Sequence, residues 1–349
     1  MNIACGGAIG FFSIGYALAY GDEGIYFGTT TEKYFLNDDD DYISFFFQFT
    51  FAATAATIVA GTVAERCKMS AYLCYSLFLT GIVYPAVVHA IWNSNGFLSA
   101  FNSDAHYGGM IDFAGSGVVH MTGGATALVA AIVLGPRIGR FYDSDGNALE
   151  KPGEFPPHSV ALQVLGTFIL WFGWYGFNPG STLGVIGYGD VLALCAVTTT
   201  LSAAAGAVSA LFFDTILGVL ADGEAEYDLT MAMNGCLGGL VGITAGCSVV
   251  EPWAALVIGL ISGVIYVLSS RLLVALKVDD AVDAIPVHFF NGAWGCIATG
   301  LFAAPRHILK AYGLIEIDGV EVVRNAGLFY DNAKLLSMEL SGVLYIIAW

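Results

Sequence analysis

Residues 111–135 read IDFAGSGVVHMTGGATALVAAIVLG, a stretch with one aspartate, one histidine and no lysine, arginine or glutamate. A helix that crosses a membrane needs about 20 consecutive, mostly apolar residues. The stretch therefore predicts a transmembrane helix. An ionisable group inside such a helix is costly to desolvate, so His120 is a candidate functional residue from the outset.

The composition of the whole chain fits this prediction. Of 349 residues, 57% are hydrophobic and 12% are charged, whereas soluble domains carry about 25% charged residues. This argues against a water-soluble enzyme. The net charge of -17 excludes nucleic acid as a partner, because phosphate binding needs a basic surface. The seven cysteines show no metal-ligand spacing, so we expect no metal site, no cofactor and no disulfide framework.

Working outward from residues 111–135, similar apolar stretches recur along the chain and predict an all-α, polytopic membrane protein. Ten candidate spans lie at about 2–20, 43–63, 71–92, 111–135, 159–178, 189–212, 228–247, 252–274, 285–303 and 333–349. Seven basic residues fall on one side of the predicted membrane and five on the other, which favours the first side as cytoplasmic. The five are Lys33, Arg306, Lys310, Arg324 and Lys334.

A weak internal repeat relates two of these spans. HMTGGATALVAAIVLGP begins at His120 and HFFNGAWGCIATGLFAAP begins at His288, each with Gly-Ala at the fourth and fifth positions after the histidine. Each histidine also has an aspartate upstream, Asp112 eight residues before His120 and Asp283 five before His288. The two spans are the fourth and ninth, and an odd offset predicts copies that cross the membrane in opposite directions.

Inverted copies would bring His120 and His288 face to face near the membrane midplane. Such a pair can share one proton, one ring donating and the other accepting, which suits conduction of a small polar molecule or a proton. Two alternatives stay open: separately satisfied core histidines, and axial ligation of a haem. Asp112 likewise has two interpretations, as a cap on a helix N-terminus or as a carboxylate that stabilises a nearby cation.

Aromatic side chains gather near one end of several predicted spans. They are Phe47, Phe51, Trp92, Trp174 and Phe177. Aromatic residues at that depth ordinarily form an interfacial belt. If they converge on one vestibule, they would instead form a cation–π site, worth about 0.5–2 kcal/mol per contact.

The loop 21–42 on the same side is acidic and includes the run Asp38–Asp41. It would concentrate cations at a pore mouth, or it is a solvated loop.

Several strings in this sequence resemble the ammonium transporter (Amt/Mep/Rh) family, most closely its plant and algal branch. They are IDFAGSGVVHMTGG, GPRIGRF, LWFGWYGFNPGS, NGCLGGLVGITAGCSVVEPW and VHFFNGAWGCIATGLFA, in the family's order and across nearly the whole chain. The resemblance implies a homotrimer of eleven-span subunits with inverted five-helix repeats and a pore through each subunit.

The resemblance also implies roles for individual residues. His120 and His288 correspond to the family's pore histidines, and Trp174 to a residue of the pore wall. The residues of the ammonium-recruiting site are Trp92, Ser181, Phe47 and Asp112, and the phenylalanine gate is Phe51 and Phe177.

The resemblance leads us to expect that residues 1–349 form a single transmembrane domain without the family's first helix and cytoplasmic tail. The repeat halves span approximately 1–140 and 159–305. The resemblance implies transport of ammonium or ammonia, with methylammonium as a further substrate, through a multi-pass protein of the plasma membrane and its lipid bilayer. An ammonium sensor on the same fold is the alternative function.

Overall fold

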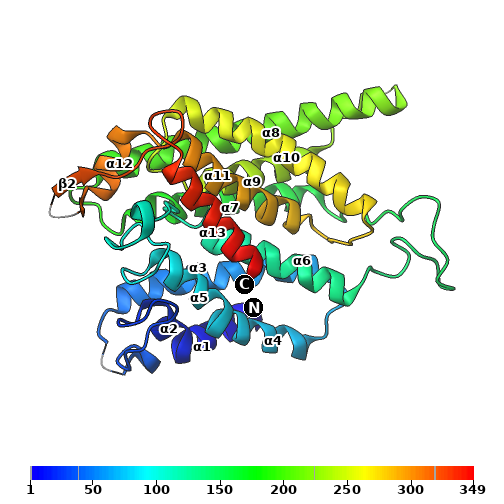
Figure 1. The fold of residues 1–349 in the computed structure, drawn as a ribbon. Coiled ribbons are helices and arrows are strands. Elements are labelled where there is room, and N and C mark those ends of the chain that lie inside the picture. Colours follow the sequence, from blue (N-terminus) through cyan, green and yellow to red (C-terminus); the bar gives the residue numbers. More distant parts are fainter. Residues whose placement is uncertain (1, 38, 224, 318–319) are drawn as a thin grey trace.

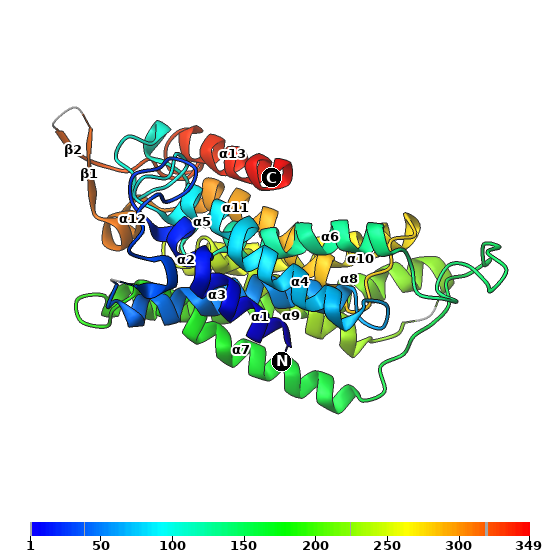
Figure 2. The same ribbon diagram turned by 90° about the horizontal axis from the view of Figure 1, so that it is seen from below.

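The computed structural model describes residues 2–37, 39–223, 225–317 and 320–349. Asp38 of the acidic run lies outside the described residues. The chain is mostly helical, and its long helices run side by side along one direction (Figures 1 and 2).

The helical elements follow the apolar pattern of the sequence. Up to residue 134 they are α1 (Asn2–Gly10), η1 (Phe11–Gly15), α2 (Tyr16–Tyr20), η2 (Tyr34–Leu36), α3 (Tyr42–Thr62), α4 (Met69–Phe78), η3 (Leu79–Val83), α5 (Tyr84–Trp92), η4 (His106–Gly108), η5 (Ser116–Met121) and α6 (Thr122–Leu134). They continue as α7 (Val160–Phe177), η6 (Pro179–Thr182), α8 (Gly189–Asp222), α9 (Leu229–Thr244), α10 (Pro252–Ala275), η7 (Ile285–Phe290), α11 (Asn291–Phe302), α12 (Pro305–Tyr312) and α13 (Lys334–Ala348). The strands β1 (Leu314–Ile317) and β2 (Val320–Val323) form an antiparallel hairpin.

Six helices in the described part of the chain are long and apolar enough to cross a membrane. They are Tyr42–Thr62, Met69–Trp92, Ser116–Leu134, Val160–Thr182, Gly189–Ala221 and Pro252–Ala275. Shorter apolar helices, Cys5–Tyr20 and Leu229–Thr244, match two further predicted spans. The spans predicted at 285–303 and 333–349 correspond to η7 with α11 and to α13. The helical class is confirmed, and the count of ten spans stays a prediction.

The boundaries of two predicted spans were wrong. The helix expected over 111–135 begins only at Ser116, because Gly115 turns the chain with φ +103° and the residues before it are not helical. The span expected to end at residue 212 is part of α8, which continues to Asp222.

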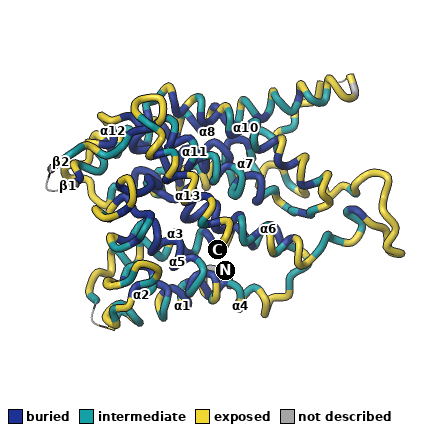
Figure 3. Tube along the Cα trace, viewed as in Figure 1, coloured by how far each residue is buried: buried dark blue, intermediate teal, exposed yellow. Residues whose placement is uncertain are grey.

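The bundle has two distinct ends in Figures 1 and 2. The hairpin end carries α12 and the β1–β2 hairpin, whereas the opposite, loop end carries the long connection between α6 and α7. The connecting loops are mostly exposed, whereas the middle of the bundle is mostly buried (Figure 3). The six longest apolar helices also present large apolar side chains outward, such as Phe172, which is 79% exposed. Only lipid or another protein chain can cover such a surface.

Small residues allow α8, α9 and α10 to approach closely. A Cβ atom on Gly239 or on Gly259 would lie 2.2 Å from the carbonyl oxygen of Ser202. The hydroxyl of Ser202 donates in turn to the carbonyl of Gly239 at 2.7 Å. A larger side chain at either glycine would separate the helices, as expected for tightly packed membrane spans.

An ion-pair cluster at the loop end joins segments far apart in sequence. Asp279, in the loop before η7, accepts from the backbone and guanidinium of Arg137 at 2.8–2.9 Å, and its backbone carbonyl accepts from Arg66. Burial alone would raise the pKa of Asp279, but the hydrogen bonds from Arg137 outweigh this effect and hold the pKa below its usual value. The cluster therefore fixes the loop that leads into η7.

Candidate functional site

The site is built around η5, a π-helical segment whose start is held by Asp112. The Asp112 side chain is buried, and its carboxylate accepts from the backbone N–H groups of Gly115 and Gly117 at 3.0 Å and of Val118 at 2.8 Å. These are N–H groups that the first turn of a helix leaves without partners. Asp112 thus has the capping geometry of the first interpretation. Its carboxylate faces the helix end, and its backbone carbonyl oxygen accepts from the indole N–H of Trp92.

The segment η7 repeats this arrangement with Asp280. Its carboxylate accepts from Ile285 N at 2.6 Å, five residues ahead, the same offset as from Asp112 to Gly117. Asp280 lies eight residues before His288, and this spacing equals that from Asp112 to His120.

Asp283, the aspartate singled out from the sequence, has a different surrounding. Its side chain accepts from Tyr266 at 2.8 Å and from Ser270 at 2.9 Å, both on α10. Asp280 is therefore the capping counterpart of Asp112, and the pairing with Asp283 was wrong.

The two π-helical segments bring the predicted histidines together. The Nδ1 atoms of His120 and His288 lie 3.1 Å apart, with ring centroids 5.1 Å apart and an interplanar angle of 17°. One ring therefore donates a hydrogen bond to the other. His120 is fully buried, and its Nε2 has no hydrogen-bond partner in the described part of the chain.

This separation leaves no room for an iron bound between the two Nδ1 atoms, as the haem alternative would need in this orientation of the rings. Each bond from a first-row metal to histidine nitrogen is about 2 Å long, so an iron between the two rings would hold their nitrogens farther apart than 3.1 Å.

The Gly-Ala motif after each histidine has a packing role. A Cβ on Gly124 would lie 2.4 Å from the backbone nitrogen of Phe289, and a Cβ on Gly292 would lie 2.6 Å from the carbonyl oxygen of Ser116. Each glycine thus lies against the π-helical segment that carries the other histidine. This reciprocal contact allows the two histidine-bearing segments to approach.

The rings of Phe51 and Phe177 lie face to face with a tilt of 30°, and this pair is next to His120. Their ring centroids are 4.1 Å apart, and Phe177 lies 5.4 Å from His120. Trp174 lies 5.2 Å from His120 in a nearly parallel stack, and its indole N–H donates to Thr244 at 3.0 Å. The aromatic residues therefore converge on one place, as the vestibule interpretation requires.

The other residues for which the resemblance implies a role in recruitment lie close to the same two rings. Phe47 lies 4.7 Å from Phe51, and Trp92 meets Phe51 edge to face at 5.8 Å. The Trp92 indole N–H donates to the carbonyl oxygen of Asp112 at 2.7 Å. Ser181 lies one turn beyond Phe177, and its hydroxyl donates a hydrogen bond to the Phe177 carbonyl at 2.8 Å. The lone pairs of the Ser181 hydroxyl oxygen can therefore accept a hydrogen bond from another group.

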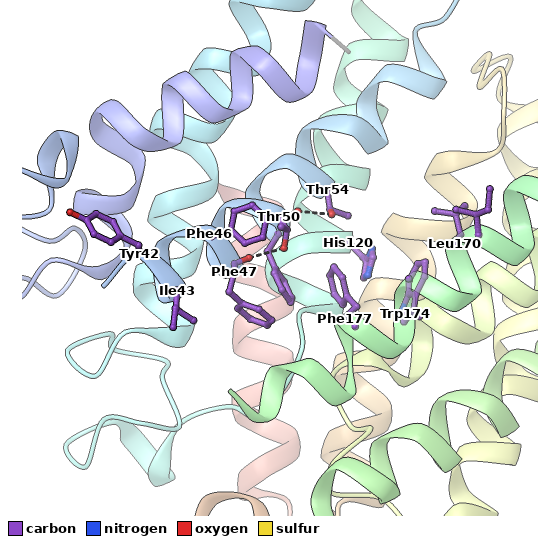
Figure 4. A pocket seen from close by; sticks show the side chains of 14 residues that line it. Tyr42, Ile43, Phe46, Phe47, Thr50, Thr54, His120, Leu170, Trp174 and Phe177 are labelled. Atoms are coloured by element: carbon purple, nitrogen blue, oxygen red, sulfur yellow. Dashed lines mark hydrogen bonds between the residues drawn. The ribbon is translucent and has the colours of Figure 1, made fainter. Parts of the chain in front are cut away.

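A cavity of about 710 Å³ opens between α3 and α7 next to these residues. Phe47, Phe51, His120, Trp174 and Phe177 all line it, and Figure 4 shows Phe177 and Trp174 beside the His120 ring. Its lining is predominantly apolar, with Thr50 and Thr54 among the few polar side chains. Trp92, Ser181 and His288 are not part of this lining.

Three residues that support the site escaped the sequence analysis. Thr244 accepts from Trp174, Asp280 caps η7, and Glu339 on α13 accepts from the backbone N–H of Ile111 at 2.7 Å. Glu339 is fully buried, and its second carboxylate oxygen has no partner among the residues described. A count of the eight-residue spacing would have found Asp280, and a search for ionisable groups within predicted spans would have found Glu339.

Comparison with known proteins places this geometry in a family. The model of the Ammonium Transporter Family matches residues 1–349. "Putative ammonium transporter 1 member 5" of Arabidopsis thaliana is 42% identical, over 99% of this chain and 69% of that protein. The crystal structure of Saccharomyces cerevisiae Mep2 is similar with a TM-score of 0.83 at 26% identity, over 99% of this chain and 73% of that one.

A structure named "Sensor Amt Protein" is also similar, with a TM-score of 0.80 at 32% identity, over 99% of this chain and 79% of that one. The curated relatives at about 40% identity are nevertheless named as transporters, and most of them come from plants. The sensor alternative is therefore not favoured. The paired histidines, the adjacent phenylalanines and the match over the whole chain agree: this protein belongs to the ammonium transporter family, and its similarity to plant members supports the plant branch.

Proposed function

We propose that ammonium crosses this chain along one path, from an aromatic cup at the hairpin end to the paired histidines. The observation that carries the proposal is the position of Phe177, which stacks on Phe51 at 4.1 Å and lies 5.4 Å from His120. The two phenylalanine rings and the histidine pair therefore follow one another directly along this path. We assign recruitment to Phe47, Trp92, Ser181 and Asp112, with Asp112 acting through its cap and its carbonyl oxygen.

The chemistry of the path follows from the cost of moving a charge through it. Aromatic faces attract a cation at the cup, and Ser181 can accept a hydrogen bond from ammonium. Beyond the cup, a bare ion would pay a desolvation penalty of several kcal/mol. Ammonium can escape this penalty by losing a proton, whereas potassium, an ion of similar size, cannot. Discrimination between the two ions therefore arises where the path becomes apolar.

Neutral ammonia then passes His120 and His288, with Trp174 forming part of the wall. The hydrogen bond between the rings leaves Nε2 of His120 free to interact with the passing molecule. The proton either returns to the hairpin side or crosses by way of the histidines, and only the second route moves net charge. We assign no catalytic residue, because apart from this proton transfer no bond of the substrate is made or broken.

The proposed architecture is ten spans of an eleven-span fold, with inverted halves of approximately 1–140 and 159–305 inside one transmembrane domain. The matched caps of Asp112 and Asp280 support the inverted repeat, as do the reciprocal contacts of Gly124 and Gly292. We further propose a homotrimer in the plasma membrane, hairpin end outward, that also accepts methylammonium. The apolar outer surface of the bundle is what subunit contacts and lipid would cover.

The test is to record the current in proteoliposomes after a jump in ammonium concentration, with potassium as the control ion. A current specific to ammonium would establish net charge movement, and a rise of internal pH without current would establish neutral conduction. We expect His120→Ala to abolish transport or its discrimination against potassium. His158→Ala, in an exposed loop, is the matched control. Unchanged transport in His120→Ala would refute the histidine path, and ammonium binding without transport by the wild type would assign a sensor.

A further inference from the structure

The basic residues at the hairpin end fall into two groups. Three are ion-paired with carboxylates, in the pairs Lys33–Asp39, Arg306–Glu251 and Lys310–Asp190. Arg324 and Lys334 have no carboxylate partner anywhere in the described ranges. In a chain with 29 acidic and 12 basic residues, two cations without acidic partners on one face need an explanation.

Arg324 is the more informative of the two, because it is partly buried. Its Nη1 donates to the carbonyl oxygen of Gly108 at 3.3 Å, its guanidinium lies 5.8 Å from the Tyr312 ring, and its Nε is buried without a partner. Burial lowers the pKa of Arg324 because it penalises the charged form. A half-buried guanidinium without a counter-charge is unfavourable, and an anion beside it would offset that cost.

The two unpaired cations line the same cavity. This cavity, of about 510 Å³, lies between the loop before Met110 and strand β2, and Arg324, Lys334 and His106 all contribute to its wall. No aspartate or glutamate of the described chain lines it. The cavity is separate from the one between α3 and α7, because the two share no lining residue.

The wall of this second cavity is ordered by contacts of its own. The Tyr107 ring lies against that of His106, with centroids 3.8 Å apart and a tilt of 39°, and Lys334 Nζ lies 5.5 Å from the Tyr107 ring. The amide of Asn325 donates to the Tyr107 carbonyl at 2.7 Å, which joins the loop to the segment that follows β2. Arg324 is attached to the same loop through Gly108. Residues from three segments are therefore held around one cationic space.

We propose that this cavity binds a phosphate group, either of a free phosphate compound or of a lipid headgroup. A phosphate carries about −1.5 to −2 charges at pH 7, which matches the combined charge of Arg324 and Lys334. The guanidinium supplies a planar, bidentate donor for phosphate oxygens, and lysine supplies a point charge. His106 adds a further ring nitrogen to the wall. The site goes beyond ammonium transport and does not depend on the proposed pore.

The first arm of the test uses inorganic phosphate and the full chain in detergent. We expect phosphate, titrated at constant ionic strength against chloride, to raise the apparent melting temperature in a saturable way. Lys334→Gln should weaken the apparent affinity at least tenfold, and Arg324→Gln should abolish the response. Lys334 is exposed, so its substitution is expected to leave the fold intact if Arg324→Gln is unstable. The matched control is Lys310→Gln, an exposed lysine at the same end that is paired with Asp190.

The second arm distinguishes the two sources of the phosphate group. Nanodiscs with phosphatidic acid are compared with nanodiscs of phosphatidylcholine alone, again with Lys334→Gln and Lys310→Gln. Saturable stabilisation by inorganic phosphate that Lys334→Gln weakens supports a free ligand. Stabilisation by phosphatidic acid alone, weakened in the same variant, supports a lipid headgroup. No response in either arm, or a response that Lys334→Gln leaves unchanged, overturns the proposal.

Discussion

The substitution Asp112→Asn tests whether this carboxylate acts mainly as the cap of η5. In the structure it accepts from three backbone N–H groups, those of Gly115, Gly117 and Val118. An asparagine has nearly the same shape but only one acceptor oxygen. Its oxygen can face Gly117 and Val118, and its amide N–H₂ then faces the N–H of Gly115. The variant therefore keeps two weakened hydrogen bonds and loses one.

The magnitude follows from these contacts. A buried donor left without a partner costs about 1–3 kcal/mol. Exchange of a charged acceptor for a neutral one roughly halves the strength of each remaining bond, a further loss of about 1–2 kcal/mol in total. The expected destabilisation is thus about 2–5 kcal/mol, a large share of the roughly 5–15 kcal/mol that stabilises a folded protein. Asp112→Ala, which removes all three acceptors, should be worse.

The assay is thermal unfolding of the full chain in detergent, followed by ammonium transport of the folded fraction. Asp112→Asn should lower the apparent melting temperature by several degrees, while Asp190→Asn, an exposed carboxylate at the same end, should not. The result that would refute the reasoning is a melting temperature equal to that of the wild type with ammonium binding lost. In that case the negative charge itself would recruit ammonium, as in the second interpretation of Asp112.

Two further predictions concern other buried carboxylates. Glu339→Leu removes the acceptor of the Ile111 N–H and should cost about 1–3 kcal/mol. Glu339→Gln keeps an acceptor oxygen for this N–H and should therefore melt close to the wild-type temperature. A Glu339→Gln variant as unstable as Glu339→Leu would contradict this reasoning. Asp279→Asn should destabilise the protein at pH 7, because its lowered pKa means that the ionised form stabilises the fold. That contribution is complete above the unfolded pKa of about 3.9 and is lost as the pH falls through the lower folded pKa. The wild type and Asp279→Asn should therefore differ less in melting temperature at about pH 3 than at pH 7. An undiminished difference at about pH 3 would contradict this prediction.

The sequence is a good guide to this molecule where one physical signal dominates. Apolar length located the six long spans to within a few residues at most of their ends. The shared Gly-Ala motif after each histidine indicated that His120 and His288 meet, and the structure places their nitrogens 3.1 Å apart. Convergence of the aromatic residues could not be decided in this way, because a belt residue and a vestibule residue have the same sequence pattern. Only the contacts of Phe51 with its neighbours separate the two interpretations.

Asp283 shows why the remaining errors arose. It is near His288 in sequence and was a reasonable partner for comparison with Asp112, but its backbone adopts φ +56°, a left-handed conformation that turns the chain just before η7. Its side chain is consequently held by Tyr266 and Ser270, while Asp280 reaches Ile285 N across the turn. Proximity in sequence says little about capping when the chain reverses direction between the two residues. The two histidine-bearing segments share the spacing from aspartate to histidine, which is eight residues in each. In both, the aspartate accepts from the first free N–H groups of a π-helical segment that begins after a left-handed turn, five residues further along the chain.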